Sequence, residues 1–370
     1  MKAIKTFFAS QTAPIFWLRI FLSIKTESTG EAVTHDLLLL ESHLKKTSAA
    51  TSTILNPSIV DGSCFQSLFH LLLKRSIEER GPSDLQTIQW YAILGKLNVD
   101  YGECEGHLRH AIEEFSNHPQ RGPEHPETID TMVALGRTYW NMKRLDQATE
   151  VFQRCYNVRT DSLGSHDPET LEVRSWLATV QRGKGSATEA CSEYEEIIRI
   201  LQSQIGRHNR VVMREIKMLG VARRHERSFD KAEAAFVECL RWCEQVLGTM
   251  HPDTVQAAKN LAMVYQVDGR LEDAESIHRD VISKQLEVTG EDAEYFISLQ
   301  NLGETLRELG RLEEAEEVLL RALKGKDQWH GPKHPHTKLT LESLTILYKD
   351  RPDLDSLCIK SQVFDRLARW

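Results

Sequence analysis

A repeat of about 42 residues is the feature that most constrains how this chain can fold. Seven glycines recur at intervals of 41 or 42 residues, namely Gly81, Gly122, Gly164, Gly206, Gly248, Gly290 and Gly331. A leucine followed by glycine or alanine keeps the same period, at Leu94, Leu135, Leu177, Leu219, Leu261 and Leu302. So does an alanine ladder, at Ala148, Ala190, Ala232, Ala274 and Ala315. Self-similarity of this kind is typical of solenoids, in which each repeat buries its apolar face on its neighbours.

Each period reads as a helix, a short turn, a second helix and a return loop. The tiny residue after each leucine of the first helix lets the second helix approach closely. Four residues after each ladder alanine stands a mostly large side chain that fills the adjacent gap: Phe152, Tyr194, Phe236, His278 and Leu319. The glycines end the second helices in a left-handed conformation, and a proline soon after starts the next helix. With no alternating strand pattern in the sequence, we predict an all-α fold, an α-solenoid.

The ladders also predict how the chain is divided. We expect four segments: a basic, apolar N-terminal tail at residues 1–30, a helical N-terminal cap at 31–81, a repeat array at 82–350 and a capping helix at 351–370. The cap contains a small-polar linker at 47–53, with helices expected at 37–44 and 65–80. The array holds about six repeats and a partial one. Its first repeat is degenerate, with His107 in the alanine position.

Composition and charge bear on compartment and partners. The net charge is −8, which argues against nucleic acid as a partner because non-specific binding to it needs a dominant basic surface. The apolar stretch at 7–24 contains Arg19 and is a poor membrane span. A mitochondrial targeting role for residues 1–26 is the alternative to a plain tail. The seven cysteines form no CxxC pair, which favours reduced thiols in the cytoplasm, with Cys239 and Cys243 as core residues. The sequence does not indicate an oligomeric state.

The repeat motif itself resembles a known family. Leu135, Gly136, Tyr139, Ala148 and Phe152 form a pattern similar to that of the tetratricopeptide repeat. The longer period, with His-Pro-x-Thr starts at 125–128 and 251–254, resembles the repeats of kinesin light chains and of kinesin-light-chain-like proteins. The resemblance covers about residues 82–350 and implies a right-handed superhelix of helical hairpins that binds other proteins.

We searched for reactive groupings and predict neither an enzyme activity, nor a cofactor, nor a metal site. Cys104, His107 and His110 carry ligand-type atoms, but on one helix the outer two diverge by about 120°. The segment 183–186 (Gly-Lys-Gly-Ser) lacks the rest of a phosphate loop and is interpreted as a turn. His330, His334 and His336 gather in one loop, where two of them belong to the repeat's own linker pattern.

The resemblance implies that the first helices line a concave face. Counting from each ladder leucine, the positions two and five residues before and after should point into it. Seven of these positions are basic: Arg137, Arg182, Arg214, Lys217, Arg224, Lys259 and Arg307. Three are acidic, at Asp130, Glu172 and Glu304. The predicted lining is therefore net positive, although the whole chain is acidic, and Trp140 lies on it as well.

Two asparagines extend this predicted groove. Asn260 and Asn301, just before their ladder leucines, match asparagines that in kinesin-light-chain-like repeats hydrogen-bond an extended peptide backbone. Ala134, Trp176 and Met218 replace them in other repeats. We therefore predict a scaffold or adaptor that binds an acidic or extended peptide segment, with a protein rather than a membrane as its partner. The alternatives are an accessory subunit of an enzyme or biosynthetic pathway, and a sensor array related to nucleotide-binding receptor proteins.

Overall fold

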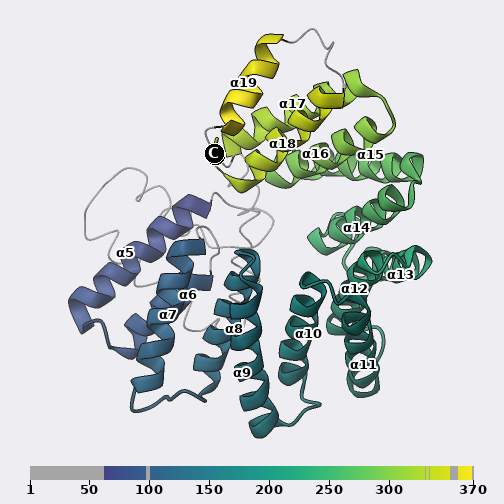
Figure 1. Cartoon of the computed structure of the whole chain (residues 1–370). Helices are drawn as coiled ribbons and strands as arrows, with labels where there is room; N and C mark the ends of the chain where they lie inside the picture. The colour runs from purple at the N-terminus through teal and green to yellow at the C-terminus, as the bar shows by residue number, and fades with distance from the viewer. Residues whose placement is uncertain (1–61, 97–100, 330, 333, 351–356, 369–370) are drawn as a thin grey trace. The chain divides into compact units, whose positions relative to one another are not determined.

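The computed structural model describes residues 62–96, 101–329, 331–332, 334–350 and 357–368. These residues form α-helices joined by short turns, with no strand among them, so the predicted all-α solenoid is confirmed (Figure 1). The chain divides into two compact units, Met1–Val180 and Gln181–Trp370, each of which is described by itself. The predicted tail at 1–30, helix at 37–44 and linker at 47–53 lie outside the described residues.

The first unit consists of helical hairpins that pack in chain order. Its helices are α5 (Gly62–Arg80), α6 (Leu85–Lys96), α7 (Tyr101–Asn117), α8 (Pro126–Asn141), α9 (Leu145–Leu163) and most of α10 (Pro168–Gly183). Each of α5 to α8 packs against the next helix, and α6 also contacts α8. The first helices of two successive hairpins therefore adjoin, which is the arrangement expected of stacked repeats.

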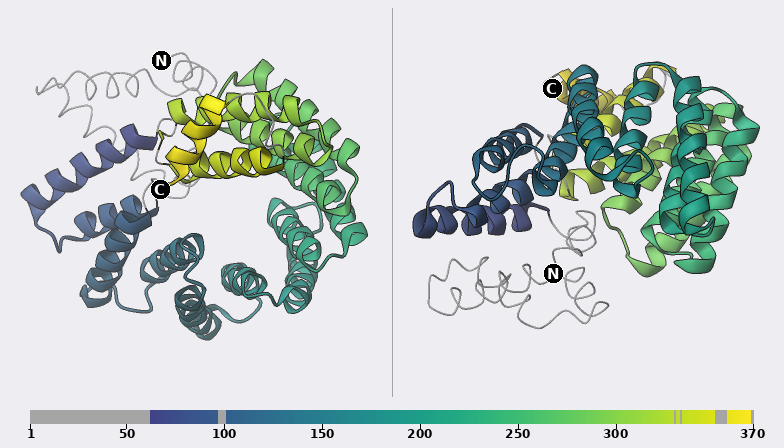
Figure 2. Two further views of the ribbon diagram at one scale, coloured as in Figure 1. Left: turned by 45° about the horizontal axis from the view of Figure 1, so that its top comes forward. Right: turned by 90° about the horizontal axis from the view of Figure 1, so that it is seen from below.

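The second unit continues the same pattern. It contains α11 (Ala187–Ile205), α12 (Arg210–His225), α13 (Phe229–Val246), α14 (Pro252–Asp268), α15 (Leu271–Val288), α16 (Ala293–Glu308), α17 (Leu312–Trp329), α18 (Pro335–Asp350) and α19 (Leu357–Ala368). Consecutive helices lie side by side (Figure 2), and the first helices again adjoin, α12 with α14 and α16 with α18. The last helix, α19, packs on α18, with Phe364 and Leu367 against the terminal apolar cluster.

The His-Pro-x-Thr motif forms the start of a first helix. In α14 the ring Nδ1 of His251 accepts a hydrogen bond from the backbone N–H of Asp253, which caps the helix, and Pro252 occupies the first turn. The hydroxyl of Thr254 donates to the carbonyl of Gly248 at 2.7 Å and so closes the return loop. The same loop closure occurs from Thr128 to Gly122 and from Thr337 to Gly331. The motif is thus structural in these repeats.

In the five hairpins from α8–α9 to α16–α17, the turn between the helices places one residue in the left-handed region. Glycine occupies this position at Gly185, Gly269 and Gly310, whereas Lys143 and Arg227 occupy it with φ of 62° and 65°. A residue with a Cβ atom is strained in this conformation by about 1–2 kcal/mol. The exposed side chain of Arg227 makes no hydrogen bond or ion pair with any residue that the structure describes.

We therefore expect Arg227→Gly to raise the free energy of unfolding by up to about 1 kcal/mol, since it relieves this strain and removes no contact. The reciprocal change, Gly269→Ala, should lower it by about 1 kcal/mol or more. Urea denaturation followed by circular dichroism measures both. A loss of stability in Arg227→Gly would show that the turn is not strained.

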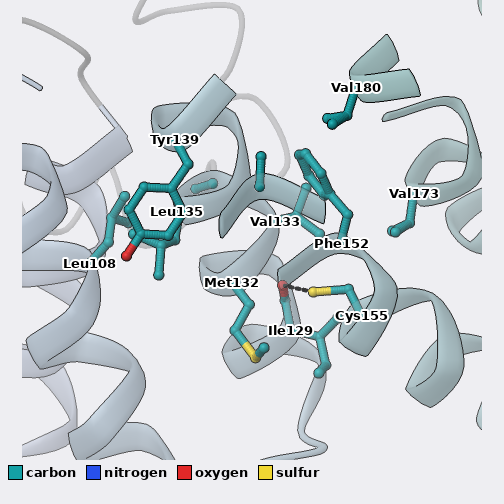
Figure 3. Close-up of a cluster of buried hydrophobic side chains, with 12 residues drawn as sticks. Leu108, Ile129, Met132, Val133, Leu135, Tyr139, Phe152, Cys155, Val173 and Val180 are labelled. Atoms are coloured by element: carbon teal, nitrogen blue, oxygen red, sulfur yellow. Dashed lines mark hydrogen bonds between the residues drawn. The ribbon is translucent and has the colours of Figure 1, made fainter. Parts of the chain in front are cut away.

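The two ladders of small residues meet in the core as predicted. The five ladder alanines and the five large residues four positions later are all fully buried. A Cβ built on Gly136 would lie 2.7 Å from Cε1 of Phe152, and one on Gly220 would lie 2.9 Å from Cζ of Phe236. Figure 3 shows Phe152 in the cluster that joins α8, α9 and α10. Glycine is thus needed where the ring of the second helix contacts the backbone of the first.

The first hairpin corrects one expectation from the sequence. Cys104, rather than His107, holds the buried alanine position, and Leu108 fills the gap over Gly95, with its Cγ 2.4 Å from a Cβ built there. The glycine and the filling residue are 13 residues apart here instead of 16. The first helix of this hairpin is shorter, because α6 ends two residues after its ladder leucine whereas α8 continues for six. Counting by the period of 42 therefore misplaced this slot.

Five cysteines are free thiols in the core: Cys104, Cys155, Cys191, Cys239 and Cys243. Cys239 and Cys243 are both buried, and Cys239 donates to the carbonyl of Met213 at 3.3 Å, as the core interpretation predicted. Burial raises the pKa of Cys155 and of Cys239 to about 12. These thiols are protonated at neutral pH and so are poor nucleophiles. No helix in the described part of the chain combines the length and hydrophobicity that crossing a bilayer requires.

Candidate functional site

The predicted lining residues all lie on first helices, in two separate sets. We use the term first-helix face for these positions on α8 and α10 in the first unit, and on α12, α14 and α16, with the end of α10, in the second. The adjoining of α12 with α14 makes the face continuous within this pair of neighbouring repeats. A peptide laid along such a pair would contact both helices at once.

Three of the predicted basic residues are neutralised within the chain. Lys259 is buried, and its ammonium lies 2.8 Å from the carboxylate of Glu294. Arg307 pairs with Asp350 at 2.9 Å, and Arg214 with the buried Glu215 at 2.9 Å. Two of these carboxylates come from the following repeat, so the sequence pattern of a single repeat does not show them. The positive charge of the face is therefore lower than the count of basic residues predicts.

The acidic positions are also engaged within the chain. Asp130 accepts a hydrogen bond from Nη2 of the buried Arg159 at 2.5 Å. Glu304 accepts from Gln300 at 2.8 Å and from Ser343 at 2.6 Å. Glu172 is half-buried on α10. Asp130 and Glu304 thus tie neighbouring helices together rather than repel an acidic ligand.

The remaining positive charge gathers at the beginning of the second unit. Arg182 and Arg224 hold the same position in successive repeats, at the ends of α10 and α12, and both are half-buried. Nη1 of Arg182 lies 3.0 Å from Nε2 of His225. Lys217 lies on α12, seven residues before Arg224. It makes no hydrogen bond or ion pair with any described residue. The cationic cluster of the face consists of Arg182, Lys217 and Arg224, with His225 in contact with Arg182.

In the first unit the face is aromatic as well as basic. The guanidinium of Arg137 lies 5.3 Å from the ring centre of Trp176, which in turn stacks on Phe152 with ring centres 5.7 Å apart. The ammonium of Lys143 lies 5.4 Å from the ring centre of Trp140. Cation–π contacts of this kind hold a charged group at the surface and keep it available to an anion.

The two asparagines differ in their surroundings. Asn260 is buried, and its Oδ1 accepts a long hydrogen bond, 3.5 Å, from Gln256 on the same helix. Asn301 is half-buried, and its side chain makes no hydrogen bond with any residue in the described ranges. Asn301 is thus the more accessible of the two for a peptide backbone.

Sequence reasoning did not find the buried polar network behind the face. Lys326 is fully buried and donates to Thr340 at 2.9 Å and to Gln300, which ties α17 to α16 and α18. Burial lowers the pKa of Lys326 to about 8. The signal was present in the repeat, because Arg159, Leu201, Cys243, Gln285 and Lys326 hold one equivalent position and all are buried.

The cysteine–histidine grouping on α7 does not converge on a common point. His107 packs against Tyr91 and His70, with ring centres 5.6 Å apart in both pairs, and His110 packs edge-on against Tyr91. Within the described ranges, no group of three His, Cys, Asp or Glu side chains is arranged to hold a metal ion.

Comparison with known proteins identifies the repeats. Models of the tetratricopeptide repeat match residues 128–169, 213–285 and 295–355. The chain contains tetratricopeptide repeats. This tetratricopeptide protein is 24% identical over 229 residues to kinesin light chain-related protein 2 of Arabidopsis thaliana, a match that covers 60% of this chain and 33% of that one. It is 24% identical over 252 residues to the related protein 3 of the same plant, covering 66% and 38%. Its repeats are of the kinesin-light-chain-like type.

The chain spans about a third of the length of these plant relatives. A solved structure, aspartyl phosphate phosphatase F of Bacillus subtilis, superimposes with a TM-score of 0.55 at 12% identity, over 82% of this chain and 74% of that one. At this identity the likeness concerns the arrangement of the helices alone.

Proposed function

We propose that this tetratricopeptide protein is a non-catalytic scaffold that binds an acidic, extended peptide segment of a protein partner along the first-helix face. Tetratricopeptide arrays bind other proteins through surfaces of this kind. The observation that carries the proposal is the cationic cluster of the second unit, which stands out because most basic residues around it are ion-paired. The five described free cysteines support a reducing, cytoplasmic location.

The proposed binding mode combines two kinds of contact. Arg182, Lys217 and Arg224 supply charge-assisted hydrogen bonds to carboxylates of the peptide. Asn301 supplies an amide group for the peptide backbone, as in other complexes with extended peptides. Because exposed charges interact less at high salt, such binding should weaken as ionic strength rises and the Debye length falls below about 10 Å.

The test is affinity capture of partners with the purified chain, comparing the wild type with a variant carrying Arg182→Glu, Lys217→Glu and Arg224→Glu. We expect this variant to lose the proteins that the wild type captures at low salt and releases at high salt, because its face repels carboxylates. Quantitative mass spectrometry of the captured fractions measures the loss.

The matched control carries Arg199→Glu, Lys231→Glu and Arg241→Glu, three exposed residues on the second helices α11 and α13. It changes the net charge by the same amount, and it should capture the same partners as the wild type. Equal capture by all three proteins, each shown to be helical by circular dichroism, would refute the proposed face.

A further inference from the structure

Within the proposed peptide-binding face, two guanidinium groups lie together, those of Arg182, which contacts His225 and Tyr194, and of Arg224. Arg182 and Arg224 stand one repeat apart in sequence. Burial is the main cause that lowers the pKa of Arg224, and the positive charge of the nearby Arg182 lowers it further. Nη1 of Arg224 is buried and has no hydrogen-bond partner among the described residues. No carboxylate of the described residues pairs with this guanidinium.

The nearby carboxylates are already used by another arginine. Glu226 and Glu195 both pair with Arg223, Glu226 at 2.9 Å, and Glu226 also accepts from Ser228 at 3.0 Å. Arg223 thus shields these two acidic groups from Arg224, its neighbour on α12. The two consecutive arginines thus differ. Arg223 pairs with two carboxylates, whereas Arg224 has a buried Nη1 without a hydrogen-bond partner among the described residues.

His225 fixes the position of the other guanidinium. Because arginine can only donate, the contact of 3.0 Å between Arg182 Nη1 and His225 Nε2 requires an unprotonated Nε2. Burial and the two arginines lower the pKa of His225, so the ring is neutral at pH 7. The group therefore carries two positive charges, both on forked guanidinium groups, and the imidazole acts as a positioning residue.

A ligand with two negative charges matches this group better than a single carboxylate. A carboxylate would leave one guanidinium uncompensated, whereas a phosphate monoester carries nearly two charges at pH 7 and offers three acceptor oxygens. Guanidinium forks bind phosphate oxygens in pairs, with good geometry. Half-buried charges are also screened less by salt than exposed ones.

We propose that Arg182, Arg224 and His225 form a phosphate-binding site that accepts a phosphorylated side chain of the bound partner. This inference rests on the proposed function, since the phosphate would be part of a peptide held on the same face. It adds that partner binding through the second unit is strengthened by phosphorylation.

The experiment titrates the purified chain with three probes: acetyl-phosphoserine amide, acetyl-glutamate amide and inorganic phosphate. Binding is followed by 31P line broadening for the two phosphates and by the shift in thermal unfolding for all three. We expect saturable binding of the phosphoserine probe, about tenfold or more tighter than that of the glutamate probe, because charge-assisted bonds to a second guanidinium are gained.

Two variants locate the site. Arg182→Gln and Arg224→Gln should each weaken the phosphoserine probe by about tenfold or more. Without ligand, Arg224→Gln should unfold at the same temperature as the wild type or higher, because it removes a buried charge that has no counter-charge. The control Arg199→Gln lies on α11, where Arg199 pairs with Glu196, and it should bind the probe like the wild type.

The remaining outcomes are also decisive. Tight binding of inorganic phosphate without binding of the phosphoserine probe would overturn the proposal in favour of a site for free phosphate. Absence of saturable binding, or equal losses in all three variants, would overturn it as well. If the wild type still captures acidic partners that the variant carrying Arg182→Glu, Lys217→Glu and Arg224→Glu loses, the proposed function stands and only the phosphate site fails.

Discussion

Truncating Phe152 to alanine should lower the free energy of unfolding by about 3–5 kcal/mol, the usual cost of removing a buried phenylalanine. The ring is fully buried where α9 packs on α8 (Figure 3). It also stacks on Trp176 of α10. Both the lost apolar burial and the cavity left behind contribute, because the helices around it are held at fixed spacing by the neighbouring repeats. Urea denaturation followed by circular dichroism measures the loss.

The close approach of this ring to Gly136 predicts a strong coupling between the two positions. In the wild type, Gly136→Ala should cost about 1–3 kcal/mol, because the new methyl group would lie 2.7 Å from Cε1 of Phe152. In the Phe152→Ala background, Gly136→Ala should raise the free energy of unfolding by up to about 1 kcal/mol. The ring that would clash with the new methyl group is absent there, and alanine favours the helix more than glycine does. Additive effects in this double-mutant cycle would contradict the packing rule that we infer for the whole array.

The architecture was predictable because local sequence features that recur in the repeats determine it. Glycine at the end of a helix, the His-Pro start and a small residue opposite a large one each act within a single hairpin, and the period then multiplies them. The first hairpin shows where this reasoning fails. Its shorter first helix moves the alanine position from His107 to Cys104, and no count made in other repeats reveals such a deletion.

The charge of the candidate face was less predictable, because ion pairs cross from one repeat to the next. The sequence places Lys259 on the face, but whether its ammonium reaches solvent depends on Glu294, 35 residues later. Arg223 and Arg224 are adjacent in sequence and have opposite fates, one paired twice and the other left with a buried nitrogen. Helical periodicity places these side chains on a face, but the choice of partner depends on the three-dimensional packing.

The second large effect concerns His278, which occupies the core position that holds Phe152, Tyr194 and Phe236 in other repeats. Its ring is fully buried, and neither nitrogen has a hydrogen-bond partner among the described residues. Burial, with a smaller contribution from the positive charge of Lys259, lowers the pKa of His278 from 6.5 to about 4. The folded chain therefore keeps this imidazole neutral in a pH range where the unfolded chain protonates it.

The sign of the pH dependence follows from this difference. Between pH 4 and pH 6.5 the unfolded state binds more protons than the folded state, so the free energy of unfolding rises with pH. Integrated over that range, His278 should contribute about 3 kcal/mol, which is fully present above pH 6.5 and lost by pH 4. Urea denaturation at half-unit intervals from pH 4 to pH 7.5 measures the slope.

Replacing the imidazole separates this effect from other titrating groups. His278→Leu puts into the slot the residue found at Leu319 in the next repeat, and it should remove about 3 kcal/mol of the pH dependence between pH 4 and pH 6.5. At pH 7 the variant should be as stable as the wild type or more stable, because two buried polar atoms without partners are gone. Lys259→Met removes a positive charge near the ring and should therefore raise the pKa of His278 in the folded state. The free energy of unfolding should then begin to rise at a higher pH than in the wild type. If the slope of His278→Leu matched that of the wild type, the buried imidazole would not be the group that titrates in this range.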